Sequence, residues 1–324
     1  MAIKIIKPGM FSTIQDMGRV GHRDIGIGPG GAMDFFAASV ANFLVGNDDQ
    51  CPVIEMHFPA AEMLFEEDAL ICITGADFGA SINDSPAPLW QPFCVKKNET
   101  LSFKKKLNGA RNYLAINGGI ISDKWLNSYS THTKVKAGGY KGRALLKEDN
   151  LQLNEIAGGR PIHNFPGFAK WVSKVYQPSN SIRCIAGPEW QLLSESAKTL
   201  FSQALFMVTP NSDRMGYRLN GSNLSLASPV ELISSPVDSG SIQLLHEGQL
   251  IVLMADHQTT GGYPRIANVI TADLPKLAQS PIHSEIRFEM ISIETAEELL
   301  LSIQDTMDDI KKECKNFYAD RHQL

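Results

Sequence analysis

The chain has 324 residues, which is enough for about two domains with sizeable cores. Its formal charge of −5 and its mixture of acidic and basic residues give no reason to expect a nucleic-acid partner. No apolar run approaches the roughly 20 residues that a membrane-spanning helix needs, so we expect no membrane segment.

The beginning of the chain and its cysteines predict the cellular compartment. Residues 1–8 alternate apolar and polar side chains, which predicts a strand rather than a signal peptide. The five cysteines are far apart and include no Cys-x-x-Cys pair. An odd, scattered set is typical of reduced packing residues, so we expect a cytoplasmic protein.

Most of the chain is predicted to form short strands separated by turn sequences such as Asn108-Gly109 and Glu247-Gly248. Strands that are broken so often favour barrels or sandwiches over alternating β/α units. The predicted strands are residues 70–74, 93–96, 100–104, 113–117, 182–186, 206–209, 230–234, 242–245 and 286–293.

Two helices interrupt this pattern. Asp34 is a suitable N-cap for a helix that runs to about Val45, with Gly46 at its end. Thr295 and Glu298 have capping-box spacing ahead of an apolar stripe, which predicts a helix over residues 295–310. The polar segment 156–178 is the best candidate for a linker, so we expect domains at 1–180 and 181–324.

The glycines of residues 26–31 match G-x-G-x-x-G, but no apolar strand precedes them, as a dinucleotide fold requires. The chain has no Walker sequence either. The same loop remains a candidate anion site, because Arg19 and Arg23 offer forked donors and Asp34 begins a helix. A surface loop whose arginines pair with nearby aspartates explains the pattern equally well.

The densest set of reactive side chains lies in residues 255–267, directly after the apolar segment 249–254. Asp256, His257, Gln258, Thr259 and Tyr263 all fall within it. A polar loop that follows a buried strand is typical of functional sites, although a glycine-rich turn that satisfies its own polar groups has the same composition.

A second charged segment, residues 212–219, places Arg214 and Arg218 four residues apart around a glycine. Guanidinium groups bind carboxylate or phosphate at two points, although from these residues alone a solvated pair on a loop is the favoured explanation. The histidines show no metal-ligand spacing and no nucleophile-elbow glycines surround a serine, so we predict neither a metal site nor a serine triad.

Ordered sequence blocks resemble one family, the biotin-dependent carboxyltransferase-like proteins, also called allophanate hydrolase subunit 2 proteins. The blocks include Thr13-Ile14-Gln15-Asp16-Met17-Gly18-Arg19, Gly31-Ala32-Met33-Asp34, Tyr113-Leu114-Ala115-Ile116-Asn117-Gly118-Gly119 and residues 213–219 and 256–270. They cover nearly the whole chain in the family's order. One departure is Tyr129, which stands in Asn127-Ser128-Tyr129-Ser130-Thr131 where the family usually has an arginine.

The resemblance implies a mainly β fold of two cyclophilin-like β-barrel domains, with few short helices and a C-terminal helix. It also implies the function of the C subunit of an ATP-dependent 5-oxoprolinase, an enzyme that opens a cyclic amide to give glutamate. The expected partners are proteins like the A and B subunits of that enzyme, together with the small-molecule substrate, and the complex is expected to use ATP.

Site residues are assigned from residue types together with the family motifs. Asp256 and His257 are the expected catalytic acid–base groups. We expect residues 13–34, 213–218 and 256–263 to converge in one cleft. The expected substrate or anion contacts are Gln15, Asp16, Arg19, Asp34, Arg214, Arg218, Gln258, Thr259 and Tyr263.

Two other functions remain open. One is a carboxyltransferase component of a biotin-dependent urea carboxylase system, which would require biotin from another chain because this sequence has no Met-Lys-Met biotinylation segment. The other is a regulatory binding protein without catalysis. The sequence does not separate these alternatives.

Overall fold

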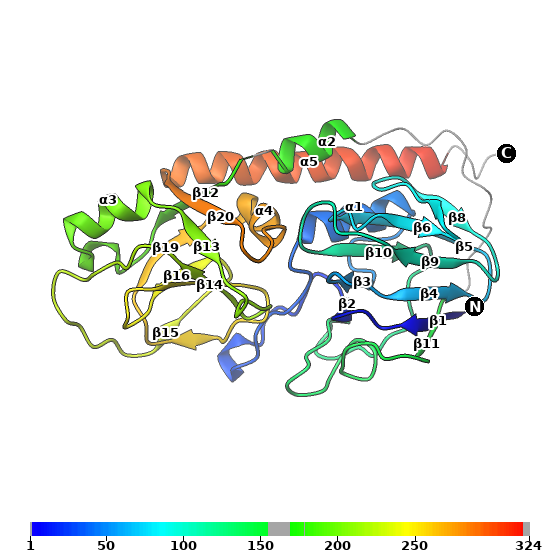
Figure 1. Cartoon of the computed structure of the whole chain (residues 1–324), viewed down its shortest axis with the longest axis horizontal. Coiled ribbons are helices and arrows are strands. Elements are labelled where there is room, and N and C mark those ends of the chain that lie inside the picture. The colour runs from blue at the N-terminus through cyan, green and yellow to red at the C-terminus, as the bar shows by residue number, and fades with distance from the viewer. Residues whose placement is uncertain (1, 155–168, 178, 320–324) are drawn as a thin grey trace. The chain divides into compact units, whose positions relative to one another are not determined.

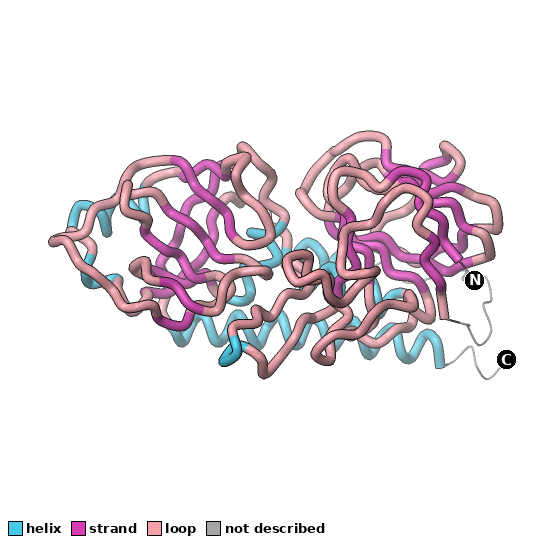
Figure 2. Tube along the Cα trace, turned by 90° about the horizontal axis from the view of Figure 1, so that it is seen from below, coloured by secondary structure: helices cyan, strands magenta, loops and turns pink. Residues whose placement is uncertain are grey.

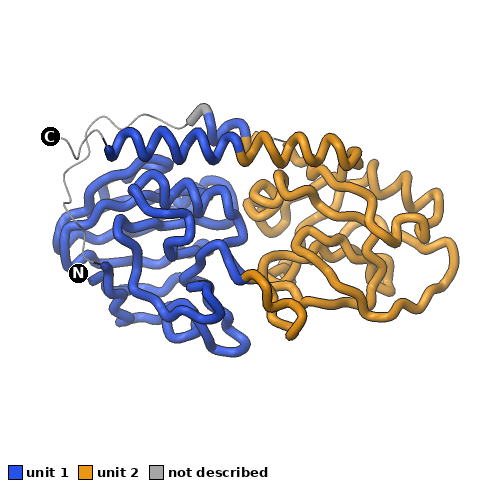
Figure 3. Tube along the Cα trace, turned by 180° about the vertical axis from the view of Figure 1, so that it is seen from behind, with its two compact units in different colours: residues 1–19, 30–174, 305–324 blue, residues 20–29, 175–304 orange. Residues whose placement is uncertain are grey.

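The computed structural model describes residues 2–154, 169–177 and 179–319 (Figure 1). Contacts divide the chain into two compact units: unit 1 contains residues 1–19, 30–174 and 305–324, and unit 2 contains residues 20–29 and 175–304 (Figure 3). More of the described residues form strands than helices (Figure 2), so the predicted mainly β fold is confirmed. The predicted domains, 1–180 and 181–324, stay a prediction about which segments fold independently.

Unit 1 is built from two mainly antiparallel sheets. The six-stranded sheet has the order β11-β1-β4-β9-β6-β7, with β1 Ala2–Lys7, β4 Glu62–Phe65, β6 Ala80–Ile82, β7 Ser85–Pro86, β9 Thr100–Phe103 and β11 Asn150–Gln152. The five-stranded sheet has the order β2-β3-β10-β5-β8, with β2 Ser12–Gln15, β3 Val53–Met56, β5 Ala69–Gly75, β8 Phe93–Val95 and β10 Asn112–Ile116.

Alternation along the five-stranded sheet separates an apolar face from a polar one. Ile14, Ile54 and Leu114 point into the apolar core that this sheet shares with the other. The residues between them in sequence, Thr13, Glu55 and Tyr113, are paired across neighbouring strands and are also buried. The second face of the sheet therefore carries a buried row of polar side chains.

Helix α1 (Phe35–Leu44) covers this polar row, since it packs against β5 and β10. Asp34 accepts a hydrogen bond from the amide of Ala37 at 2.9 Å, and Gly46 follows the C-cap Val45 with a φ of 79°. The predicted helix, its cap and its end are confirmed. A Cβ on Gly46 would lie 3.2 Å from the ring of Tyr318, so the C-terminal helix α5 (Ile293–Ala319) leaves little room at this turn.

Unit 2 contains a closed seven-stranded barrel with the order β12-β19-β16-β17-β14-β13-β20. Its strands are β12 Ser181–Ala186, β13 Phe206–Val208, β14 Gly216–Asn220, β16 Ser241–Leu244, β17 Leu250–Leu253, β19 Arg265–Val269 and β20 Glu285–Met290. A separate two-stranded sheet pairs β15 (Ser235–Pro236) with β18 (Thr260–Gly261). The predicted strand over residues 230–234 is wrong, because the chain there has no ladder partner in the described structure and pairing begins only at Ser235.

Three buried phenylalanine rings pack against one another in the core of unit 2. The Phe201 ring, from α3 (Glu195–Gln203), stacks on the Phe288 ring of β20 with 4.9 Å between the centroids, and Phe206 contacts both. The remaining short elements of the described chain are α2 Ala169–Val175, α4 Leu274–Ala278, and the 3-10 turns η1 Arg23–Ile25, η2 Trp190–Leu192 and η3 Thr271–Asp273.

The C-terminal helix α5 spans Ile293–Ala319. It begins earlier and ends later than the sequence predicts. The amide of Thr295 donates to the Ser292 hydroxyl at 3.2 Å, so Ser292 caps the helix and Thr295 lies in its first turn. Ile303 and Ile310 of the predicted apolar stripe are buried, which agrees with a docking face.

Two sequence expectations concern other parts of the chain. Most of the predicted linker, residues 156–178, lies outside the described residues, and its described part includes α2. All five cysteines are described and free of disulfide bonds. Among the described residues, no helix is both long enough and apolar enough to cross a membrane.

Candidate functional site

Arg214 and Asp256 join the two charged segments of unit 2. Arg214 Nε donates to Asp256 Oδ2 at 2.8 Å and Arg214 Nη2 donates to Oδ1 at 2.9 Å. The amide of Asp256 donates to the carbonyl oxygen of Arg214, also at 2.8 Å. Because the Arg214 side chain is 6% exposed, this two-point pair holds the loop after β17 against the start of β14 from within the fold.

His257 is buried next to this pair, with a different partner. Its Nδ1 lies 2.5 Å from the carbonyl oxygen of Gln258, which only accepts, so Nδ1 carries the proton. Burial lowers the pKa of His257, since the charged imidazolium would lose its hydration there. Asp256 bonds to Arg214 and His257 to Gln258, so the acid–base role expected of the two adjacent residues stays a prediction.

The amino-terminal loop of residues 20–29 belongs to unit 2 and contacts the same region. Arg23 donates to the carboxylate of Asp238 and to the carbonyl oxygen of Val237. A Cβ on Gly28 would lie 2.7 Å from the carbonyl oxygen of His257, so the backbone of the loop approaches too closely for any side chain there. Arg23 therefore forms internal contacts, and its partner is Asp238 rather than a neighbour in sequence.

A small polar cavity of about 250 Å³ lies beside the loop after β17. Its polar lining consists of Asn211, Asp213, Arg218, Gln243, Gln258 and Tyr263. Three of these residues, Arg218, Gln258 and Tyr263, are among the substrate contacts predicted from the sequence, and the structure brings them together. Asp213 is already engaged, because its Oδ1 accepts from the amide of Met215 at 2.8 Å.

One wall of the cavity is a row of side chains on the outer face of the barrel. Strand pairing places Arg218 beside Ile251, Ile251 beside Gln243, and Gln243 beside Arg265. The two arginines in this row differ. Arg265 bonds to Glu189 through Nε and Nη2 at 2.9 and 2.7 Å, whereas the guanidinium of Arg218 has no hydrogen-bond or ion-pair partner among the described residues.

Gln243 is a buried polar residue of the cavity lining that has an unpaired donor in the described structure. It is 1% exposed, and its Nε2 has no hydrogen-bond partner in the described part of the chain. An unpaired buried donor costs about 1–3 kcal/mol of stability. A Cβ on Gly261 would lie 2.5 Å from Gln243 Nε2, so only glycine at position 261 leaves space for this carboxamide.

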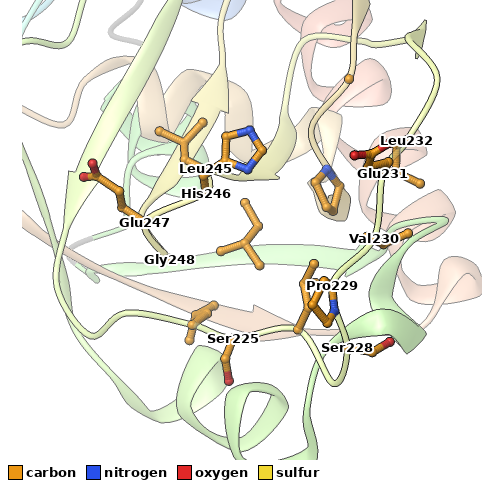
Figure 4. Close-up of a pocket in the computed structure, with 15 residues that line it drawn as sticks. Ser225, Ser228, Pro229, Val230, Glu231, Leu232, Leu245, His246, Glu247 and Gly248 are labelled. Carbon is orange, nitrogen blue, oxygen red and sulfur yellow. The ribbon is translucent and has the colours of Figure 1, made fainter.

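A larger and more open groove of about 770 Å³ adjoins the cavity (Figure 4). Leu245 lines both spaces, and the ring of Tyr263 in the cavity meets the ring of His246 in the groove edge-on, with 5.2 Å between the centroids. Glu231 and Glu247 lie on opposite sides of the groove. The groove therefore has a glutamate on either side, whereas the smaller cavity carries one arginine and one aspartate.

In unit 1, Asp16 organises the segment that contains Tyr129. Its carboxylate accepts from the hydroxyls of Ser128 and Ser130 at 2.7 and 2.6 Å and from the amide of Tyr129 at 2.5 Å. Arg19 donates to the carbonyl oxygen of Ser130 and is 3% exposed, with its guanidinium 4.8 Å from the centroid of the Trp125 ring. Asp16 and Arg19 thus shape this loop, and their expected substrate contacts stay predictions.

Gln15 and Asp34 are also buried in unit 1. Gln15 Nε2 donates to Thr13 at 2.9 Å, and Gln15 Oε1 has no partner in the described structure. The amide of Asp34 donates to the Tyr113 hydroxyl at 2.9 Å, and that hydroxyl donates to Glu55 at 2.9 Å. The carboxylate of Asp34 caps helix α1 by accepting from the amide of Ala37. A role in binding for Gln15 or Asp34 stays a prediction.

The expected convergence of three segments is visible only within unit 2. Residues 20–29 meet His257, Arg214 meets Asp256, and Arg218 lines a cavity with Gln258. Thr259 lies in the same loop, where its carbonyl oxygen accepts from Val237, but it does not line the cavity. Because residues 13–19 and 30–34 belong to unit 1, convergence of all three segments stays a prediction.

Sequence reasoning missed three important polar residues. Gln243, Glu55 and Tyr113 lie in strands that are otherwise apolar, which is the signal that was available. A polar side chain at a buried strand position requires a partner, and the strand pattern alone does not say which. In the described chain, no three His, Cys, Asp or Glu side chains are grouped to hold a metal ion.

Comparison with known sequences defines the class. Residues 25–290, well over half of the chain, match the family model described as the carboxyltransferase domain, subdomains A and B. The chain belongs to this carboxyltransferase domain family.

Within this class, particular relatives differ in how much of their length they share. The 5-oxoprolinase C subunit of Haemophilus influenzae is 36% identical over 310 residues, which cover 96% of this chain and 98% of the relative. The Escherichia coli protein of the same name is 38% identical over 294 residues, covering 91% and 93%. The urea amidolyase of Saccharomyces cerevisiae is 31% identical over 316 residues, covering 92% of this chain but 17% of the amidolyase.

A solved structure supports the same relationship. The urea amidolyase of K. lactis has a TM-score of 0.87 and 29% sequence identity, covering 95% of this chain and 20% of that one. This chain therefore has the fold of one segment of a much longer protein.

Proposed function

We propose that this chain is the C subunit of an ATP-dependent 5-oxoprolinase, which opens 5-oxoproline to glutamate together with partner subunits. The observation that carries the proposal is the share of each relative's length that this chain matches. The two relatives named as 5-oxoprolinase C subunits match this chain almost from end to end in both directions, whereas the yeast urea amidolyase shares 17% of its own length.

Opening of the lactam requires hydrogen-bond donors for the substrate, and unit 2 contains such donors. A five-membered lactam resists hydrolysis. Phosphorylation by ATP converts its amide oxygen into a leaving group. The substrate must also be held by its carboxylate and its carbonyl oxygen, and both are hydrogen-bond acceptors. Arg218 and Gln243 line one small cavity, and neither the Arg218 guanidinium nor Gln243 Nε2 has a partner among the described residues. Arg214 with Asp256 fixes the loop that forms one wall of this cavity.

Several groups in the loop of residues 20–29 that could bind a nucleotide phosphate are already bonded within unit 2. The amide of Gly26 donates to Arg23 and the amide of Ile27 donates to His22, so neither is free for phosphate. The guanidinium of Arg23 is bonded to Asp238 and Val237. This supports the proposal that another subunit binds ATP and that activity requires the assembled complex.

Carboxyl transfer with biotin is the second candidate. It is favoured by the family model, which describes a carboxyltransferase domain, and by the similarity to the K. lactis urea amidolyase. Under this alternative a separate chain carries biotin, and the same cavity faces the carboxyl acceptor. The small share of the amidolyase that this chain covers makes it the weaker candidate.

The test is reconstitution with proteins like the A and B subunits. We expect glutamate release from 5-oxoproline and ATP by the complex, and none by this chain alone. Arg214→Ala or Asp256→Asn should lower turnover at least about tenfold, the low end of what one positioned charged group contributes. Arg287→Gln, an exposed position on the barrel, is the matched control and should leave turnover unchanged.

Other outcomes of this test separate the alternatives. Turnover by the chain alone would contradict the shared-site proposal. A folded, complete complex that releases no glutamate would favour carboxyl transfer or regulatory binding, which assays with carboxybiotin and urea then distinguish.

A further inference from the structure

We infer that the cavity beside Gly261 is the binding site in this chain for a small carboxylate that also carries an amide carbonyl, with Arg218 binding the carboxylate and Gln243 the carbonyl oxygen. This inference rests on the proposed function and identifies the substrate-recognising residues within it. It adds Gln243 and Gly261, neither of which is among the substrate contacts expected from the sequence.

The size of the cavity selects a small ligand. Its volume of about 250 Å³ is below the roughly 300–1,000 Å³ of pockets that hold drug-sized molecules. A nucleotide is excluded by charge as well, because Arg218 is the single cation in the described lining and Asp213 adds a negative charge. A ligand with a single negative charge and one small ring satisfies both the size and the charge condition.

The donors available in the cavity match two different acceptors. The guanidinium of Arg218 is a planar fork that binds a carboxylate at two points, and it has no partner among the described residues. Gln243 lies two strands away, with Ile251 between them, so an apolar side chain separates the two donors. That spacing suits a ligand with a carboxylate at one end, an apolar ring in the middle and a carbonyl at the other end.

The carboxamide of Gln243 supplies the donor for the carbonyl. Its Nε2 is buried without an acceptor in the described structure. The terminal torsion of glutamine is broad and nearly two-fold, so the amide turns at small cost to present Nε2 to the cavity. A ligand carbonyl then gives this buried donor the acceptor that the described residues do not supply.

Gly261 leaves the space that this carboxamide occupies. A Cβ at this position would lie 2.5 Å from Gln243 Nε2 and would displace it. The next residue, Gly262, provides a matched control, because a Cβ there meets nothing closer than the carbonyl oxygen of Leu232 at 3.6 Å in the described structure. We therefore expect Gly261→Ala to weaken ligand binding and Gly262→Ala to leave it unchanged.

The experiment measures binding of three probes to the full chain by calorimetry and ligand-observed NMR. The first probe, 5-oxoproline, carries both acceptors, 2-pyrrolidinone lacks the carboxylate, and L-proline lacks the carbonyl. We expect 5-oxoproline to bind at least about tenfold more tightly than either of the others, since each loses one hydrogen-bonded group.

Two variants assign each group to its residue. Arg218→Gln should weaken 5-oxoproline by about tenfold or more and leave 2-pyrrolidinone unchanged, because only the first carries a carboxylate. Gln243→Met should weaken both lactams and leave L-proline unchanged. Gly261→Ala should reproduce the Gln243→Met pattern.

The inference is overturned if the full chain does not bind 5-oxoproline, or if either variant weakens all three probes equally. Failure here is distinct from failure of the proposed function. If the complex releases glutamate but these variants bind 5-oxoproline normally, the substrate binds elsewhere and the inference fails. If the chain binds the probes selectively but the complex has no turnover, the binding site stands and the proposed reaction fails.

Discussion

Arg214 and Asp256 bond to each other through both side chains and backbone, with Arg214 Nε 2.8 Å from Asp256 Oδ2 and the Asp256 amide 2.8 Å from the Arg214 carbonyl oxygen. The two residues are separated by 42 positions in the chain. Their contact places the loop after β17 beside the beginning of β14. Polar side chains of both segments, including Arg218 and Gln258, consequently line one cavity.

Breaking this pair should destabilise the chain. Asp256→Asn removes the counter-charge that Asp256 supplies to the guanidinium of Arg214, which is 6% exposed. Because Asp256 itself is 29% exposed, we expect a loss of about 2 kcal/mol in the free energy of unfolding, between the values for surface and fully buried pairs. Urea unfolding of the isolated chain measures it. Arg218→Ala is the control, and an equal loss there would contradict the assignment.

The stability of unit 2 should depend on pH through His257. In the folded protein, burial lowers the pKa of His257 below its ordinary value of 6.5. Arg23 lowers this pKa further, whereas Asp238 and Asp256 oppose the shift. The unfolded chain therefore takes up the proton first as the pH falls. The contribution of the neutral ring is complete above about pH 6.5, the unfolded value, and is lost as the pH drops from there through the lower folded pKa.

Two measurements test this dependence. Urea midpoints between pH 7.5 and 5 should fall more steeply for the wild-type chain than for His257→Gln. An NMR titration of the His257 ring should give a pKa below 6.5, and a value at or above it would refute the prediction.

The Tyr113 hydroxyl should stabilise unit 1. It accepts from the amide of Asp34 at 2.9 Å and donates to Glu55 at 2.9 Å, and the side chain is fully buried. Burial raises the pKa of Tyr113 well above 10, so the hydroxyl stays protonated and able to donate. Tyr113→Phe removes both hydrogen bonds at a buried site, and we expect a loss of about 1–3 kcal/mol in the free energy of unfolding.

The control for this variant is Tyr140→Phe. The Tyr140 hydroxyl makes one long contact of 3.4 Å to the carbonyl oxygen of Asn150, at an exposed site. We expect that change to stay within about 0.5 kcal/mol. Similar losses for both variants in chemical denaturation would show that the buried network adds nothing specific.

Asp16→Asn should loosen the segment around Tyr129. The Asp16 carboxylate accepts from four donors, which are the Gly18 and Tyr129 amides and the Ser128 and Ser130 hydroxyls. An asparagine amide group replaces one accepting oxygen with a donor, so at least one of these bonds is lost at a cost of about 2 kcal/mol. Hydrogen exchange of residues 125–131 should increase, whereas Asp24→Asn at an exposed position should not change it.

The sequence by itself determined the class of fold and the local elements whose causes are local. Short segments separated by turn dipeptides predicted several strands of each unit, among them β5, β10, β12 and β16, and Asp34 and Gly46 predicted both ends of α1, because caps and alternation act within a few residues. Where the local signal was ambiguous, prediction failed. The strand expected over 230–234 has apolar residues but no neighbouring strand to pair with in the described structure, and Ser292 rather than Thr295 caps α5.

Only the tertiary structure decided what the polar residues contact. The sequence located Arg214, Arg218, Asp256 and Gln258 in two charged segments, but whether each side chain pairs internally or faces a cavity depends on strand register. Arg265 bonds to Glu189 at the start of η2, whereas Arg218, in the same row, has no partner among the described residues. Packing of the separate β15–β18 sheet also brings Gly261 close to Gln243, a contact between residues with no local pattern in common. Such long-range contacts depend on how the barrel strands pair and on how the segments around them pack, and no short sequence window contains that information.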